Sequence, residues 1–182
     1  MATISEKQKN TYDALKEIFG YKNVMQTPTV EKVVISIGVG KETDKNRIKR
    51  IKERIALITG QQPVETLAKQ SIAQFKLREG TLAGYKTTLR GEAMWNFLEK
   101  LISVALPRTR DFRGISNSSV DAMGNYTLGL KENAIFPETA DEDVRTMFGM
   151  AITVVTSASD AKETQAYLEH LGFPFKKAEV KA

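Results

Sequence analysis

Residues 85–106 read Tyr-Lys-Thr-Thr-Leu-Arg-Gly-Glu-Ala-Met-Trp-Asn-Phe-Leu-Glu-Lys-Leu-Ile-Ser-Val-Ala-Leu, and they decide the fold. The segment from Tyr85 to Arg90 predicts a strand that returns from a loop at about 74–84, as the second arm of a hairpin does. The segment from Glu92 to Leu106 predicts a core helix with a broad apolar face, which Pro107 ends. A hairpin strand next to a core helix favours an antiparallel sheet covered by helices.

Helices and strands mix without a regular βα repeat on both sides of this segment. Further helices are predicted at 5–20, 44–59, 141–147 and 160–171, and further strands at 30–39, 64–68, 125–130 and 150–156. Two pairs have the spacing of a capping box: Ser5 with Gln8, and Asp160 with Glu163. We therefore expect an α+β fold: a single domain over 1–182, with a mainly antiparallel sheet, helices packed on one face, and an extended loop at about 74–84.

The composition limits the class of protein. There is no cysteine and a single histidine, His170, so disulfides, thiolate chemistry and the usual transition-metal sites are not expected. No run approaches the roughly 18–20 apolar residues of a membrane helix, and the N-terminus resembles neither a signal peptide nor a transit peptide. We expect a cytosolic protein, or one made in the compartment where it works, with no cofactor and no membrane partner.

The positive charge is localised. The net charge is +5, and basic residues outnumber acidic ones between Lys41 and Arg54, whereas acidic residues dominate 138–143. The basic side chains on the predicted helix suggest a face for RNA or another polyanion, with a solvated helix face as the alternative. The candidate contacts on this face are Arg47, Lys49, Arg50 and Arg54.

A second basic segment reads Leu-Pro-Arg-Thr-Arg-Asp-Phe-Arg-Gly at 106–114. Guanidinium groups present planar forks of donors that suit phosphate oxygens, so Arg108, Arg110 and Arg113 are candidate contacts to RNA or to a protein. The alternative is a solvated turn in which Asp111 pairs with one arginine.

The segment Gly-Val-Gly-Lys-Glu-Thr at 38–43 follows a predicted strand and precedes a predicted helix. It fails as a nucleotide phosphate loop, because Ile35 stands at the first glycine position and Glu42 at the position of the metal-binding hydroxyl. A tight turn is the better interpretation, and a nucleotide-dependent enzyme is disfavoured.

An ordered series of segments resembles one family over nearly the whole chain, namely the bacterial type of large-subunit ribosomal protein number five. The matching segments are 24–32, 38–40, 59–63, 71–76, 88–91, 106–114, 124–126, 135–138 and 173–175. The resemblance implies a non-enzymatic protein of the central protuberance of the large ribosomal subunit, which binds 5S rRNA. It also implies contacts with 23S-type rRNA, peptidyl-site tRNA, neighbouring large-subunit proteins and a protein of the small-subunit head. The competing function is an RNA-binding or chaperone module outside the ribosome.

The resemblance also implies roles for individual residues. Hydrogen bonds to 5S rRNA map to Ser36, Gln61 and Thr88, with Lys69, Ser71 and Arg90 supporting the backbone contact. Lys76 and Arg78 of the extended loop would face tRNA. Ser36 departs from the family, since most members carry Asn there. The segment 67–71 has lost two of the family's positive charges, for which the basic helix at 45–54 would compensate.

Overall fold

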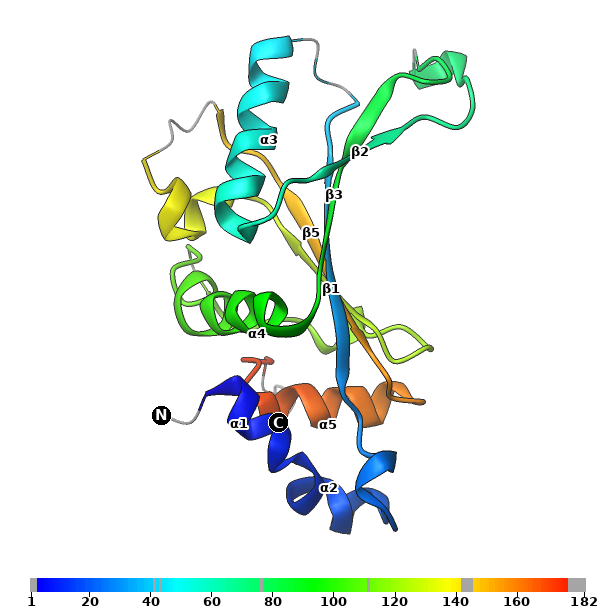
Figure 1. Cartoon of the computed structure of the whole chain (residues 1–182), viewed down its shortest axis with the longest axis vertical. Helices are drawn as coiled ribbons and strands as arrows, with labels where there is room; N and C mark the ends of the chain where they lie inside the picture. Colours follow the sequence, from blue (N-terminus) through cyan, green and yellow to red (C-terminus); the bar gives the residue numbers. More distant parts are fainter. Residues whose placement is uncertain are drawn as a thin grey trace, which may run out of the picture. The chain divides into compact units, whose positions relative to one another are not determined.

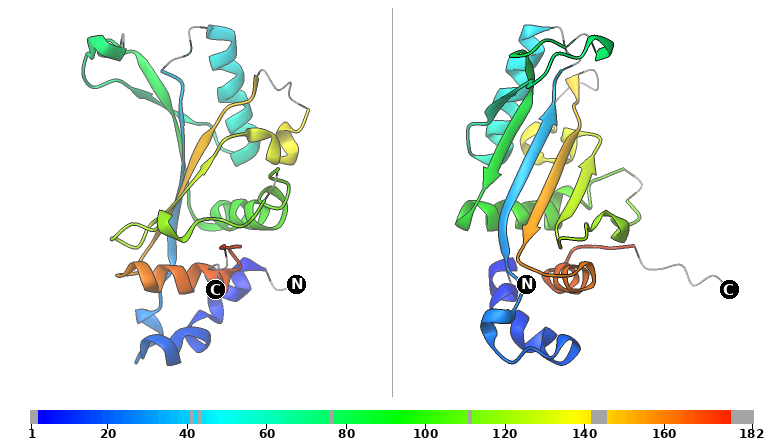
Figure 2. Two further views of the ribbon diagram at one scale, coloured as in Figure 1. Left: turned by 180° about the vertical axis from the view of Figure 1, so that it is seen from behind. Right: turned by 90° about the vertical axis from the view of Figure 1, so that its right-hand side faces the viewer.

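The computed structural model describes residues 3–40, 42, 44–75, 77–110, 112–141 and 146–176. Its strands form one sheet in the order β2-β3-β1-β5-β4 (Figure 1). The strands are β1 Val30–Gly38, β2 Val64–Leu67, β3 Leu82–Leu89, β4 Tyr126–Leu130 and β5 Met150–Thr156. The predicted α+β class with an antiparallel sheet is confirmed (Figure 2).

The chain divides into two compact units, each assembled from segments far apart in the sequence. Unit 1 comprises 1–33, 90–128 and 153–182, and unit 2 comprises 34–89 and 129–152. Most of the predicted rRNA contacts fall in unit 2, whereas Arg90 and the arginines of 106–114 fall in unit 1.

The N-terminal part of unit 1 corrects one prediction. The single helix expected at 5–20 is two helices, α1 Ile4–Lys9 and α2 Thr11–Phe19, which meet at Asn10. The capping box of α1 uses Thr3 and Glu6, not Ser5 and Gln8. The Thr3 N–H donates to Glu6 Oε2 at 2.9 Å, and the Glu6 N–H donates to Thr3 Oγ1 at 3.3 Å.

The remaining helices of unit 1 are α4 Gly91–Lys100 and α5 Ala161–Leu171, and α1 packs against both. The predicted core helix is confirmed, but its last turn, Leu101–Ala105, is π-helical. Asp160 makes no side-chain cap, so the second capping box is wrong. Glu163 instead accepts hydrogen bonds from the Tyr21 hydroxyl and, at 2.9 Å, from the Ser159 N–H. Short 3₁₀ turns occupy Val24–Gln26 and Asn117–Ser119.

Unit 2 is built on α3 Lys45–Thr59, which packs against β3. Asp44 caps its N-terminus by accepting the Asn46 N–H at 2.9 Å, and Gly60 ends it at φ 69°. Ile51, Ile55 and Ile58, which recur at helical spacing, are buried. Two 3₁₀ turns, Asn133–Ile135 and Pro137–Thr139, also belong to this unit. The helix predicted at 141–147 falls largely outside the described residues.

The loop expected at 74–84 begins and ends earlier in the sequence than predicted. Strand β3 begins at Leu82, and its partner β2 is antiparallel, with Val64 opposite Lys86 and Thr66 opposite Gly84. Gly84 fits this strand because a Cβ there would lie 2.4 Å from the Ile37 carbonyl oxygen. Residues 68–81 form the excursion between the two strands, and a 3₁₀ turn, Ala73–Phe75, lies within it.

No helix among the described residues is long and apolar enough to cross a bilayer.

Candidate nucleic-acid interface

The strands of unit 2 have two unlike faces. In β1, Ile35 and Ile37 are buried while Ser36 between them is exposed. In β3, Tyr85, Thr87 and Leu89 are buried. Lys86 is exposed and Thr88 is half-buried on the opposite side of that strand. The pleat therefore presents a serine, a lysine and a threonine together to solvent.

The backbone contacts between β1 and β3 bring these side chains close to one another. The Val39 N–H donates to the Ala83 carbonyl at 2.9 Å. Since the strands are antiparallel neighbours, Ser36 lies beside Lys86, and Thr88 is the next residue of β3 on that face. We call Ser36, Lys86 and Thr88 the exposed strand face.

Gln61 lies at one end of this face. It follows the C-cap of α3, is exposed, and its N–H donates to Thr59 Oγ1 at 3.3 Å. The pairing of Val64 with Lys86 places Gln61 and Thr88 at the same end of the β2–β3 hairpin. The three residues predicted to hydrogen-bond to 5S rRNA therefore lie in one region of unit 2.

The opposite face of these strands is covered by α3. Glu65, which pairs with Tyr85, accepts a hydrogen bond from Lys52 of α3 at 2.9 Å. This hydrogen bond and the carboxylate charge raise the pKa of Lys52 above its ordinary value. Burial, with a smaller contribution from Glu65, raises the pKa of Tyr85. The charges on this side tie β2 to α3.

The excursion at 68–81 carries the other candidates of unit 2. Lys69 and Arg78 are exposed, whereas the Ser71 hydroxyl accepts the Glu79 N–H at 2.9 Å. Ser71 therefore shapes the excursion as well as lying on its surface. Lys76 lies outside the described residues.

The basic face of α3 is divided between structural and solvent-facing side chains. Arg47 pairs with Glu42 at 3.3 Å and donates to the Met147 carbonyl at 3.4 Å. Lys49 and Arg50 are exposed, and Arg54 is half-buried. Both partners of Arg47 belong to unit 2, so its guanidinium group is less available to bind phosphate than the side chains of Lys49 and Arg50 are.

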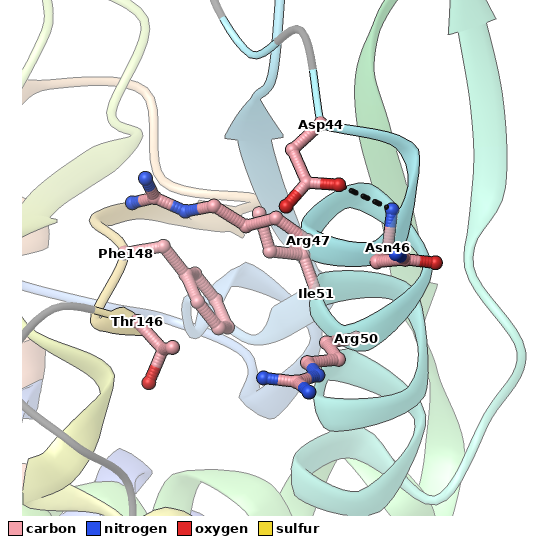
Figure 3. A pocket seen from close by; sticks show the side chains of 7 residues that line it. All are labelled: Asp44, Asn46, Arg47, Arg50, Ile51, Thr146 and Phe148. Atoms are coloured by element: carbon pink, nitrogen blue, oxygen red, sulfur yellow. Dashed lines mark hydrogen bonds between the residues drawn. The ribbon is translucent and has the colours of Figure 1, made fainter.

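A pocket of about 330 Å³ lies beside the N-terminal half of α3 (Figure 3). The guanidinium groups of Arg47 and Arg50 flank the Phe148 ring there, and the Asp44 carboxylate lies above it. The carboxylate offsets part of the positive charge in this pocket.

The four candidate arginines of unit 1 are all exposed: Arg90, Arg108, Arg110 and Arg113. Arg90 is the N-cap residue of α4. The segment after Arg113 is hydrogen-bonded to the segment at 174–176. The Ile115 N–H donates to the Pro174 carbonyl, and the Lys176 N–H donates to the Ile115 carbonyl, each at 2.9 Å. Gly114 has φ 92°, and a Cβ there would lie 2.9 Å from the Lys176 nitrogen. Asp111 lies outside the described residues, so the predicted Arg–Asp pair stays a prediction.

Lys86 is the surface residue that sequence reasoning missed. The alternation of β3 contains the signal, since Lys86 and Thr88 are two residues apart and must share a face. Among the described residues, no cluster of three or more His, Cys, Asp or Glu could hold a metal ion.

Comparison with known proteins identifies the family. The model of "Ribosomal protein L5" matches residues 23–78, and the model of the C-terminal part of the same ribosomal protein family matches residues 82–175. Together the two matches cover most of both units.

Three bacterial relatives carry the name large ribosomal subunit protein uL5. The protein of Ureaplasma parvum serovar 3 is 52% identical over 172 residues, which is 94% of this chain and 93% of the relative. The protein of Malacoplasma penetrans is 51% identical over 93% of this chain and 91% of its own length. That of Thermoanaerobacter sp. is 49% identical over 97% of this chain and 100% of its own length. The chain therefore belongs to the ribosomal protein L5 family of bacterial type, and it is a structural, RNA-binding protein of the large ribosomal subunit rather than an enzyme.

Proposed function

We propose that unit 2 binds 5S rRNA through the exposed strand face, with Gln61 at its edge. The observation that carries the proposal is the separation of the two faces: α3 covers one, while Ser36, Lys86 and Thr88 occupy the other. Structured RNA is bound mainly through phosphates, 2′-hydroxyl groups and shape, so short hydroxyl side chains beside a lysine are suitable partners. Ser36 supplies one hydroxyl where most members of the family carry an amide, and Lys86 adds a charge for phosphate.

The excursion at 68–81 extends this interface toward a second RNA. Arg78 and Lys69 are exposed on it, and Lys76 belongs to the same segment. Lys69 with Ser71 would support the 5S rRNA backbone, and Lys76 with Arg78 would contact peptidyl-site tRNA. The protein would thereby link 5S rRNA, in the central protuberance of the cytoplasmic ribosome, to the tRNA in the peptidyl site.

Unit 1 supplies a separate set of cations. Arg90, Arg108, Arg110 and Arg113 are exposed and would contact rRNA, of the 5S or 23S type, or a neighbouring ribosomal protein. On α3, Lys49 and Arg50 are the better candidates for phosphate, since Arg47 is paired with Glu42. A contact with a protein of the small-subunit head would complete these interactions.

A gel-shift titration with 5S rRNA tests the proposal. Labelled 5S rRNA is titrated with the protein, and unlabelled 5S rRNA or an unrelated structured RNA of equal length is then added as competitor. We expect only 5S rRNA to compete efficiently at moderate salt, because phosphate contacts alone are not selective. Equal competition by the unrelated RNA would instead favour a general RNA-binding or chaperone module.

A further inference from the structure

A groove of about 720 Å³ lies between the C-terminal end of β1 and the excursion that follows β2. It is lined by Gly38, Gly40, Glu42, Gln74, Phe75, Leu77 and Ala83, all of which belong to unit 2. Its volume is within the range of pockets that hold small organic groups. Gly38 follows Ser36 on the same side of β1, two residues further along, so the groove lies beyond one end of the exposed strand face.

One wall of the groove carries an exposed aromatic ring on a fixed turn. Phe75 is 68% exposed although it is one of the largest apolar side chains of the unit. Its N–H donates to the Ile72 carbonyl at 3.2 Å, and the Ile72 N–H donates to the Leu77 carbonyl at 2.9 Å. These bonds fix the backbone that presents the ring at the surface, where a base can stack on it.

Other parts of the lining lack bulky side chains. A Cβ on Gly38 would meet nothing within 4 Å, and a Cβ on Gly40 would lie 3.6 Å from the Ala83 carbonyl oxygen. Neither glycine has a φ in the left-handed region, so backbone strain does not demand glycine at these positions. Their absent side chains leave room for a flat group to lie against the backbone.

The polar residues of the lining favour a neutral group over phosphate. Glu42 contributes a carboxylate, which accepts N–H donors although its ion pair with Arg47 offsets part of its charge, and Gln74 offers an amide that both donates and accepts. The cation Arg78 is exposed in the same excursion, where it can bind a phosphate that flanks the base.

We propose that this groove binds one unpaired nucleobase of an RNA strand, which stacks on Phe75. The inference rests on the RNA-binding function proposed above and adds to it a site for a base. The edge of the base would meet Gln74 and Glu42, while a flanking phosphate would meet Arg78 outside the groove. This mode reads an unstacked base, unlike the exposed strand face, which suits structured RNA.

The test uses the full chain and two short single-stranded RNA probes of equal length and charge. One is oligoadenylate, and the other is the same backbone with abasic positions. Binding is followed by fluorescence anisotropy of a label at the end of each probe. The wild type is expected to bind oligoadenylate more tightly, because only that probe carries bases to stack.

Two variants examine the groove itself. Phe75→Ala should lower the affinity for oligoadenylate by roughly 5- to 150-fold, with little effect on the abasic probe, while Phe75→Trp should retain the preference. Gly38→Val should also weaken the preference, since Gly38 lines the groove and a side chain is added there without backbone strain. The matched control is Gly129→Val in β4, where a Cβ likewise meets nothing within 4 Å.

Circular dichroism melts establish that each variant is folded, and each is also titrated with 5S rRNA. Loss of the base preference in both groove variants, with 5S rRNA binding intact, supports the proposal. Equal binding of the two probes by the wild type, or full preference in either Phe75→Ala or Gly38→Val, overturns it. Failure of 5S rRNA binding in the wild type is a different result, which counts against the proposed function rather than against the groove.

Discussion

The two faces of β1 and β3 in unit 2 come from alternating residues of the same strands, yet they have opposite surroundings. Ile35 and Leu89 are almost inaccessible to solvent, whereas Ser36 and Lys86 are exposed beside each other. The side that α3 covers holds the strands in place through burial of apolar surface. The other side contributes little to that packing and is available to a partner. Stability and RNA binding should therefore respond to different substitutions one residue apart.

The largest expected effect is on the buried face. Ile35→Ala should lower the free energy of unfolding by about 2–5 kcal/mol, because it removes buried methyl groups and leaves a cavity. Chemical denaturation measures the change. The neighbouring Ser36→Ala serves as the control and should stay within about 0.5 kcal/mol of the wild type. Similar losses at both positions would mean that the two faces do not differ in packing.

The next effect is on the exposed strand face. Lys86→Glu should weaken 5S rRNA binding about tenfold at low salt, because it replaces an attractive charge beside phosphate with a repulsive one. The melting temperature should change little. Lys162→Glu makes the same change of charge at an exposed position of α5, outside the interface. If both variants weaken binding equally, only the net charge of the protein matters.

Substitutions on the basic face of α3 should have a smaller effect on 5S rRNA binding. They distinguish the solvent-exposed cations from Arg47, which is paired within the protein. The double variant Lys49→Gln/Arg50→Gln should reduce the salt dependence of 5S rRNA binding by about 0.7–0.9 in log–log slope for each phosphate that the variant no longer neutralises. Arg47→Gln should leave the slope unchanged and lower thermal stability, since Arg47 bonds to Glu42 and Met147. An unchanged slope in the double variant would show that this helix face is merely solvated.

The smallest effect concerns the ion pair between α3 and β2. Glu65→Gln removes the partner of Lys52, and a pair at the surface contributes little to stability. The pKa of Lys52 is raised, so the contribution of the pair is intact below the ordinary value of 10.5 and is lost as the pH rises above it. Melting temperatures of wild type and variant should therefore converge at alkaline pH. A difference that persists unchanged there would exclude Lys52 as its source.

Much of the fold could be predicted from the sequence, because strong apolar periodicity coincides with clear end signals. The helix at 45–59 has buried isoleucines at helical spacing, Asp44 at its start and Gly60 at its end. The break in the N-terminal helix could not be predicted, because the apolar pattern continues across Asn10, where the structure begins a new helix. The start of β3 was missed because Gly84, usually a loop signal, is required there by the close approach of Ile37.

The candidate site was predictable only in part. The roles of Ser36, Gln61 and Thr88 in RNA binding were predicted from the family resemblance. The alternation of side chains along β1 accounts for the exposure of Ser36. Two features of the site could not be predicted: the ion pair between Arg47 and Glu42, and the groove beside Phe75. Both depend on how segments pack together in space, which local sequence patterns do not show. The basic helix therefore looked more uniform in sequence than it is in the structure.

The most direct test of the proposed interface is the dissociation constant of 5S rRNA for the double variant Ser36→Ala/Thr88→Val. Thr127→Val, at an exposed threonine of β4 in unit 1, is the control. We predict about tenfold weaker binding for the double variant, because it removes two hydrogen bonds to the RNA, with an unchanged melting temperature. Wild-type affinity in the double variant would contradict the assignment of this face to 5S rRNA.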